Sequence, residues 1–486
     1  MDRANARPHV VIVGGGISGL AAAFFLRDEA VRVTVLEGWP RLGGKLSVSE
    51  IAGLAVDEGA EALLVTRPEG TALIAEAGLG DQRTAPGPTS SAIWTLGALR
   101  PLPRRQFMGV PSDMTELARS GVLSPEGVAR ASQDFELPPT ARDGDVPVAE
   151  YVGARLGDEV VNRLVDPLLG GVYAGRSAEL SFDATLPALA AASRRHRSLA
   201  EAAGSLLSAQ APAPGTRAGG SVFTTLAGGL GMLPAYLAKA SGAEVRTSAM
   251  VRDLARADGG WRLTVGSAAA PERVDADAVI LAVPARPAGR LLADVPGLSA
   301  AVTAFGQISY ASMAIVTLAY PRPAFPGPGL AALGWSGYLV PAVDGRAVKA
   351  VTFSSVKWPH LAVPAPSGTE PLEIVRCSVG RIGEEALLQR ADDELAALAA
   401  ADLAAATGVR GAPAATRVTR WGGALPQYTV GHLDRVAAIR AAVGTQPGLA
   451  VCGAAYDGVG IPACVATART AVSQVLDFLA ARPAAG

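Results

Sequence analysis

The feature that most constrains this chain is a glycine motif near its N-terminus. Residues 10–13 (Val-Val-Ile-Val) form a short apolar run rich in β-branched residues, which is typical of a buried strand. Gly14, Gly16 and Gly19 follow with the spacing G-x-G-x-x-G, and residues 21–27 then have the composition of a helix. Between a strand and a helix, such glycines let the backbone approach a pyrophosphate at the helix N-terminus. The sequence therefore predicts a dinucleotide-binding unit at the start of the chain.

A second strand, at residues 31–36, ends at an acidic residue. Glu37 lies 23 positions after Gly14, near the place where an acid binds the ribose hydroxyls of a dinucleotide. The motif and this acid together predict a set of cofactor-binding residues: Gly14, Gly15, Gly16, Ile17, Ser18, Gly19 and Glu37.

The stretch directly after this acid distinguishes between cofactors. Residues 37–45 have the pattern E-x-x-x-R-x-G-G-K, which resembles a run of the FAD-dependent amine oxidase and desaturase superfamily. Gly43 and Gly44 would allow a second close approach of the backbone to the cofactor. Arg41 and Lys45 would supply positive charge near the diphosphate. The resemblance implies FAD, because dinucleotide domains that bind only NAD lack this run.

Size and composition exclude several classes of protein. A chain of 486 residues with 49% apolar and 18% charged residues suits a globular protein of two or three domains. The net charge of −1 gives no sign of a nucleic-acid partner. Three scattered cysteines predict neither a disulfide framework nor a metal site, and they suit a cytoplasmic protein. No stretch of 18 residues is apolar without a charge or a helix breaker, so the sequence predicts no membrane span. Peripheral contact with a membrane stays open.

The patterning along the chain predicts an α/β fold with a discontinuous Rossmann-like FAD domain. A strand, a glycine turn and a helix recur near the C-terminus, so both ends of the chain are expected in this domain. The middle of the chain is helical at first and then rich in strands. The expected divisions are an FAD domain at 1–105, 216–299 and 411–486, a helical domain at 106–215, and a mixed-sheet substrate domain at 300–410.

Further motifs resemble the oxygen-dependent porphyrinogen oxidases. The most specific are Asp-Pro-Leu-Leu-Gly-Gly-Val-Tyr-Ala-Gly at 166–175 and Pro-Gln-Tyr-Thr-Val-Gly-His at 426–432. Shorter matches lie at 108–111, 196–199, 357–360 and 458–462. The resemblance covers nearly the whole chain and is closest to the Gram-positive branch, which oxidises coproporphyrinogen III rather than protoporphyrinogen IX.

This resemblance implies further cofactor contacts. Val251 would offer its backbone to the adenine, Trp421 would pack near the flavin, and Val459, Gly460 and Ile461 would lie against the isoalloxazine. Where the family often has Gly-Pro-Asp-Ser, this chain has Gly59, Ala60, Glu61 and Ala62, so backbone contacts to the flavin could persist but a serine contact could not.

The resemblance also implies the chemistry and the candidate substrate residues. FAD would remove six electrons from coproporphyrinogen III, two at a time, and pass them to oxygen with release of hydrogen peroxide. Arg67 is the first candidate for positioning the substrate, since the family has a basic residue there. Other arginines could meet the propionates of the substrate: Arg104, Arg105, Arg176, Arg194, Arg195 and Arg197.

Several alternatives remain open from the sequence. A protoporphyrinogen IX oxidase would share the chemistry but bind a substrate with two propionates instead of four. An amine oxidase or a carotenoid desaturase is disfavoured by the runs at 166–175 and 426–432. A flavin-binding partner protein without turnover is a different class again. The sequence also leaves open a transient contact with a ferrochelatase. The protein could be either a monomer or a homodimer.

Overall fold

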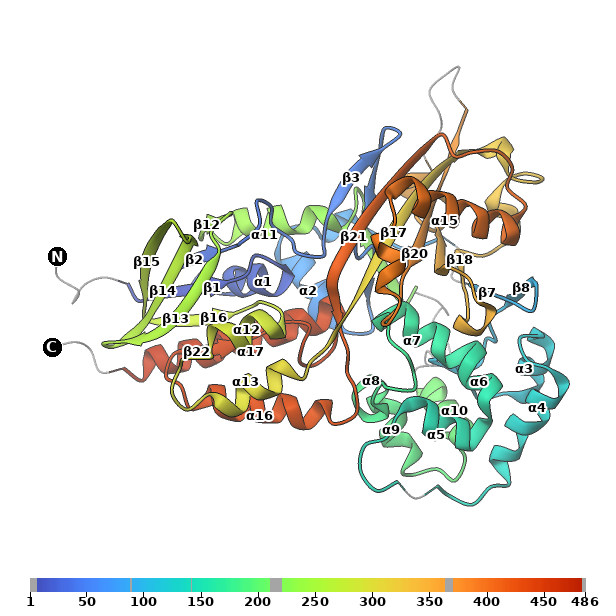
Figure 1. Ribbon diagram of the computed structural model, residues 1–486, viewed down its shortest axis with the longest axis horizontal. Coiled ribbons are helices and arrows are strands. Elements are labelled where there is room, and N and C mark those ends of the chain that lie inside the picture. Colours follow the sequence, from blue (N-terminus) through green and yellow to red (C-terminus); the bar gives the residue numbers. More distant parts are fainter. Residues whose placement is uncertain (1–6, 88–89, 141, 210–220, 363–369, 483–486) are drawn as a thin grey trace.

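The chain forms two sheet-bearing parts and one helical part. The computed structural model describes residues 7–87, 90–140, 142–209, 221–362 and 370–482. One sheet lies toward the two termini, a second lies at the other end of the molecule, and the helical part packs beside the second sheet (Figure 1). The α/β class expected from the sequence is confirmed.

A parallel sheet of five strands is built from distant parts of the chain. Its order is β12-β2-β1-β16-β22, and each neighbouring pair is parallel. The strands are β1 (His9–Val13), β2 (Arg32–Leu36), β12 (Glu244–Arg246), β16 (Ala278–Leu281) and β22 (Leu449–Val451). Strand β1 lies in the centre, and all five of its residues are buried. This placement explains its continuous apolar sequence, because a parallel strand is covered on both faces.

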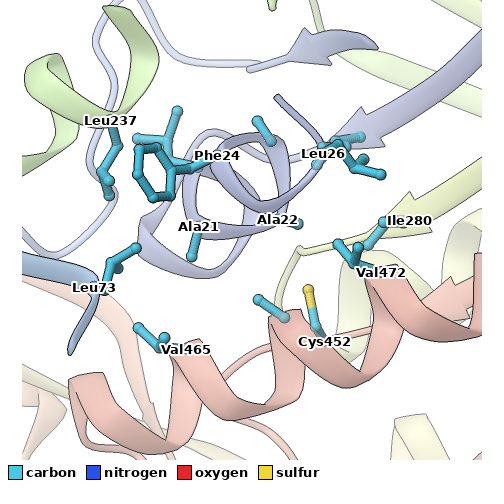
Figure 2. Packing of buried hydrophobic residues seen from close by; sticks show 14 of the residues in the cluster. Ala21, Ala22, Phe24, Leu26, Leu73, Leu237, Ile280, Cys452, Val465 and Val472 are labelled. Atoms are coloured by element: carbon cyan, nitrogen blue, oxygen red, sulfur yellow. The ribbon is translucent and has the colours of Figure 1, made fainter. Parts of the chain in front are cut away.

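Helices from both ends of the chain cover one face of this sheet. Helix α17 (Ile461–Ala480) packs against α1 (Ile17–Phe25) and α2 (Pro68–Glu76), and α1 also packs against α11 (Leu233–Ala240). Figure 2 shows Ala21 and Ala22 of α1 facing Val465 and Val472 of α17. The small alanine side chains let the two helix backbones approach closely. The N-terminal and C-terminal segments therefore share one hydrophobic core.

The opposite face of the parallel sheet carries an antiparallel layer and further helices. The strands of the layer are β13 (Val251–Ala257), β14 (Gly260–Ser267) and β15 (Ala270–Ala276). The helices are α12 (Ala285–Leu291), α13 (Ser299–Gly306) and α16 (His432–Gly444). Trp261 and Phe305 are fully buried in the core between these elements.

A mixed sheet of seven strands forms the second part. Its order is β21-β17-β20-β19-β18-β7-β8. The strands are β7 (Ala92–Thr95), β8 (Ala98–Pro101), β17 (Tyr310–Pro321), β18 (Gly337–Leu339), β19 (Val348–Phe353), β20 (Leu372–Val379) and β21 (Ala415–Pro426). Helix α15 (Asp392–Thr407) packs on one face, and the short helix α14 (Ser354–Lys357) follows β19.

The expected domain divisions differ from this strand pairing at two places. Strands β7, β8 and β21 pair within the seven-stranded sheet, although the divisions at 1–105 and 411–486 assign them to the FAD domain. Hydrogen-bonded strands belong to one sheet wherever they lie in the sequence, and the pattern of a single strand does not reveal its partner. The domain limits themselves stay a prediction.

The helical part has its own core. Ser124 caps the helix at Pro125, accepting a hydrogen bond from Gly127 N at 3.0 Å. Residues 182–209 form three successive helices, because Pro187 starts a new one and residues 194–198 interrupt the run. The helices are α3 (Met114–Ser120), α4 (Pro125–Ser132), α5 (Val148–Leu156), α6 (Asp158–Val160), α7 (Asp166–Tyr173), α8 (Phe182–Thr185), α9 (Pro187–Ser193) and α10 (Leu199–Ala209), with a π-helical turn at Val161–Val165.

The remaining strands are short and pair outside the two large sheets. They are β3 (Val48–Ile51) and β4 (Leu54–Asp57), β5 (Leu63–Leu64), β6 (Arg83–Thr84) and β11 (Phe223–Leu226), and β9 (Gln106–Phe107) with β10 (Val110–Pro111). Within the parts of the chain that the structure describes, no helix is both long enough and apolar enough to cross a membrane.

Candidate cofactor site

The glycine motif leaves an open cradle at the N-terminus of α1. Gly14 adopts φ +108°, and a Cβ atom there would lie 2.6 Å from the carbonyl oxygen of Ala282. A Cβ atom on Gly19 would lie 1.9 Å from the carbonyl oxygen of Gly14, so neither glycine can be replaced without moving the backbone. Among the described residues, in contrast, no atom lies within 4 Å of the Cβ position of Gly16, and no side chain caps the helix that it starts. Free helix N–H groups facing open space suit a phosphate. Ile17 and Ser18 form the first turn of this helix.

Glu37 lies beside this cradle. One carboxylate oxygen accepts a hydrogen bond from Gly15 N at 2.7 Å, and the other accepts one from Trp39 N at 2.8 Å. Both oxygens keep further lone pairs for a ribose hydroxyl. Val251 begins β13 close by, since Ala249 N donates to Glu37 O at 2.8 Å.

The second glycine pair joins the first loop. Gly43 N donates to Gly15 O at 2.8 Å, and the Cβ position of Gly44 lies 3.4 Å from the Cα of Gly16. Lys45 follows, and burial lowers the pKa of its ammonium group. Among the described residues, no ion pair includes Lys45. A cation withdrawn from water without an anion beside it fits the diphosphate of a dinucleotide.

The loop after β4 lies against the same region. A Cβ atom on Gly59 would lie 1.9 Å from the carbonyl oxygen of Lys45, and Ala60 N donates to that oxygen at 3.2 Å. Trp421 covers the loop, because its indole N–H donates to Glu58 O at 2.9 Å. The exposed Arg41 holds its guanidinium 5.6 Å from the Trp421 ring.

Glu61 uses its side chain for the fold and leaves only its backbone for a cofactor. Its carboxylate pairs with Lys357 at 2.8 Å and with Arg376. Arg376 also donates to Gly59 O at 2.6 Å. Burial alone would raise the pKa of Glu61, but the two cations outweigh it and lower this pKa to about 2. Ala62, next in the chain, packs beside Trp358 and other apolar residues.

The turn before α17 completes the site. Gly460 is the N-cap of α17, no side chain in the described part of the chain caps the helix, and its first turn carries no acidic residue. Gly458 adopts φ +136°, and its Cβ position lies 3.7 Å from a guanidinium nitrogen of Arg67. Arg67 is half exposed, and its one ion pair among the described residues is a 3.5 Å contact with Glu69. The turn at 458–461 therefore has a cation near Gly458 whose ion pair is long and open to solvent.

Cys464, near the start of α17, is close enough to Lys45 and Arg67 for their charges to affect its thiol. Burial raises the pKa of its thiol, while the charges of Lys45 and Arg67 both oppose the rise. Cys452 is buried as well, and burial likewise raises the pKa of its thiol.

The structure does not gather the other candidate arginines at this turn. Arg176 pairs with Glu384 at 3.8 Å, Arg194 pairs with Asp183 at 3.1 Å, and Arg197 donates to backbone carbonyls of the helical part. Arg104, Arg105 and Arg195 are on the surface. Arg67 is thus the candidate that the fold brings to the turn at 458–461.

Sequence reasoning missed three residues that hold the site together. Lys357 and Arg376 anchor the loop at 59–62, and Tyr428 is bonded to the turn before α17. Tyr428 and Lys357 lie within the motifs of the porphyrinogen oxidases, but a motif does not reveal which backbone atoms a side chain contacts.

Comparisons with known proteins identify the family of this chain. Residues 17–476 match the family "Flavin containing amine oxidoreductase". The coproporphyrinogen III oxidase of Mycobacterium tuberculosis is 40% identical over 480 residues, covering 97% of this chain and 98% of that protein. The coproporphyrinogen III oxidase of Bacillus subtilis is 30% identical over 491 residues, covering 98% and 99% of the two chains.

A solved structure has the same fold. A provisionally named protoporphyrinogen oxidase from Exiguobacterium sp. 255-15 superposes with a TM-score of 0.82 at 30% identity, covering 97% of this chain and 99% of that one.

Proposed function

The chain belongs to the flavin-containing amine oxidoreductases, among their porphyrinogen oxidases, with FAD as cofactor, and from this premise we propose that it oxidises coproporphyrinogen III to coproporphyrin III with oxygen. The observation that carries the proposal is the 40% identity, over nearly the whole chain, to the mycobacterial coproporphyrinogen III oxidase. The resemblance found in the sequence motifs is thereby confirmed at the level of the family.

The electron balance of the proposed reaction is simple. The macrocycle of a porphyrinogen loses six electrons and six protons on the way to the aromatic porphyrin. Bound FAD supplies the two-electron chemistry, so three rounds consume three molecules of oxygen and release three of hydrogen peroxide.

We assign the cofactor to the loops that converge at the carboxyl ends of the parallel strands, where α/β sheets bind ligands. The residues proposed to hold FAD are Gly14, Gly15, Gly16, Ile17, Ser18, Gly19, Glu37, Arg41, Gly44, Lys45, Gly59, Ala60, Glu61, Ala62, Val251, Trp421, Val459, Gly460 and Ile461. Lys45 is the strongest support, since its charge has no anionic partner among the described residues. The open N-termini of α1 and α17 would bind anionic groups at the two ends of the cofactor.

Arg67 would hold a propionate of the substrate beside the turn at 458–461. Its guanidinium lies next to Gly458, its contact with Glu69 is weak, and half of its side chain faces solvent. A planar guanidinium binds a carboxylate through two parallel hydrogen bonds, which would orient the macrocycle over the flavin.

Protoporphyrinogen IX is the alternative substrate, and it has two propionates where coproporphyrinogen III has four. A site built for the tetra-acid makes additional charged hydrogen bonds, each contributing about 1.5–3 kcal/mol. We expect kcat/KM for coproporphyrinogen III to exceed that for protoporphyrinogen IX by about tenfold or more.

The test is the rate of porphyrin fluorescence with each freshly reduced substrate, in air, with the FAD-loaded protein. Faster turnover of the di-acid would keep the chemistry and overturn the proposed substrate. A yellow protein that oxidises neither substrate would overturn the enzyme proposal in favour of a flavin-binding partner protein.

A further inference from the structure

Tyr428 lies at a junction between three segments of the chain. It follows β21, and only 1% of its surface is exposed. Its backbone carbonyl accepts a hydrogen bond from Ser181 N at 2.8 Å, which fixes it to the helical part. Its side chain points to the loop between β22 and α17. Tyr428 therefore connects the end of the seven-stranded sheet and the helical part to that loop.

The phenol hydroxyl of Tyr428 bridges two points of this loop. It donates a hydrogen bond to Ala454 O at 2.6 Å and accepts one from Gly458 N at 2.8 Å. A hydroxyl has one hydrogen and free lone pairs, so both bonds can form at once. The bridge spans the irregular stretch that ends in the turn at 458–461. No other hydroxyl among the described residues bonds to backbone atoms at both ends of this stretch.

The aromatic ring of Tyr428 is fixed as firmly as its hydroxyl. The His432 ring stacks on it with the ring centres 3.7 Å apart and the planes 13° apart. Tyr173 packs on it with ring centres 5.5 Å apart. His432 is fully buried, and burial lowers the pKa of its imidazole to about 4, so the stack stays neutral at physiological pH. A ring held on two sides places its hydroxyl with little freedom.

We infer that Tyr428 is a positioning residue, whose hydroxyl sets the place of the turn at 458–461 against the flavin. The inference rests on the proposed contact between Val459–Ile461 and the isoalloxazine. Gly458 has no side chain that could anchor the turn, and its φ of +136° suits only glycine. The Tyr428 hydroxyl therefore restrains the turn by its hydrogen bond with Gly458 N, in place of a side chain at Gly458. Without this hydroxyl the turn would shift relative to the flavin, and small misplacements in an active site reduce rates strongly.

The test compares Tyr428→Phe with Tyr456→Phe, both loaded with FAD. The first removes the bridging hydroxyl and keeps the stacked ring. The second removes a buried hydroxyl from the same loop that has no hydrogen-bond partner among the described residues. The readouts are the visible spectrum, the midpoint potential and the affinity of the bound flavin, together with kcat and KM.

We expect Tyr428→Phe to change the flavin spectrum and midpoint potential and to lower kcat by about ten- to a hundredfold, with KM within about twofold of the wild type. We expect Tyr456→Phe to match the wild type in every readout. Identical flavin properties in the two variants would overturn the inference, as would loss of the folded state in Tyr428→Phe, which would assign the hydroxyl to stability alone.

The flavin readouts also separate this inference from the proposed function. If the wild type oxidised neither porphyrinogen, the proposed function would fail, yet the spectrum, potential and FAD affinity of the two variants would still decide the role of Tyr428.

Discussion

At the scale of single residues, the site is defined by charges that the fold leaves with weak partners or none. Lys45 lies in no ion pair among the described residues, and Arg67 makes one weak contact. Removing a charged group from water is costly unless another group compensates for it. We therefore expect charged side chains with weak partners or none to be the ones that bind a ligand.

Arg67→Ala should raise KM for coproporphyrinogen III about tenfold, because a charged hydrogen bond to a propionate contributes about 1.5–3 kcal/mol. We expect a smaller effect on kcat, which steady-state kinetics would show. Arg67→Lys should recover part of the loss, since it keeps the charge but not the planar fork. The exposed Arg83, replaced by alanine, serves as the control. An unchanged KM in Arg67→Ala would remove this arginine from the substrate site.

Asp57 should make the stability of the protein depend on pH. Burial raises the pKa of this carboxyl from 3.8 to about 6, although it accepts hydrogen bonds from Leu230 N and Gly231 N. The pKa of Asp57 is higher in the folded state than in the unfolded state, so protonation of Asp57 favours folding. This contribution to the free energy of unfolding is present in full below pH 3.8 and is lost as the pH rises through 6. The shift of about two units corresponds to on the order of 3 kcal/mol.

The measurement is urea unfolding of the wild type and of Asp57→Asn across this pH range. Between about pH 4 and about pH 7.5, the free energy of unfolding should change in favour of Asp57→Asn by on the order of 3 kcal/mol. Parallel pH profiles of the two proteins would show that Asp57 titrates alike in the folded and unfolded states.

At the scale of elements, one buried ion network attaches the loop at 59–62 to the seven-stranded sheet. Glu61 pairs with Lys357 of α14 and Arg376 of β20, and Arg376 also binds the carbonyl of Gly59. Residues of α14 and β20 therefore hold in place the loop that Trp421 covers. The network has a structural role that the motif at 59–62 did not reveal.

Glu61→Gln should destabilise the fold by about 3 kcal/mol, since it leaves two largely buried cations without their anion. Chemical denaturation measures this loss. The control is Glu76→Gln, which breaks an exposed 3.4 Å pair with Arg469 and should cost less than about 0.5 kcal/mol. Equal stability losses in the two variants would mean that the buried network contributes no more than a surface pair.

At the scale of the whole molecule, local patterns predicted the elements but not their partners. The strand at 10–13, the glycine turn at 14–19 and the strand at 31–36 follow from residue type and spacing. Strand β15 was not predicted, because its exposed polar sequence resembles a loop. Strand β21 was not predicted either, since most of its residues are partly or fully exposed and its place is set by pairing with β17.

The same distinction holds for the site. The glycine turn and the place of Glu37 at the end of β2 could be predicted because they depend on neighbours close in sequence. The hydrogen bond from Gly458 N to the Tyr428 hydroxyl, and the nearness of Arg67 to Gly458, join segments that are distant in the sequence. Only the folded chain brings such groups together, so spacing in the sequence cannot reveal them.

The stoichiometry of a complete turnover tests the proposed oxidation of coproporphyrinogen III most directly. Oxygen uptake and hydrogen peroxide would be measured alongside coproporphyrin III, formed from coproporphyrinogen III by the FAD-loaded protein. We expect about three molecules of oxygen to be consumed and about three of peroxide to be released per porphyrin, as six electrons taken two at a time require. Bound FAD without oxygen uptake or porphyrin formation would overturn the proposed oxidation.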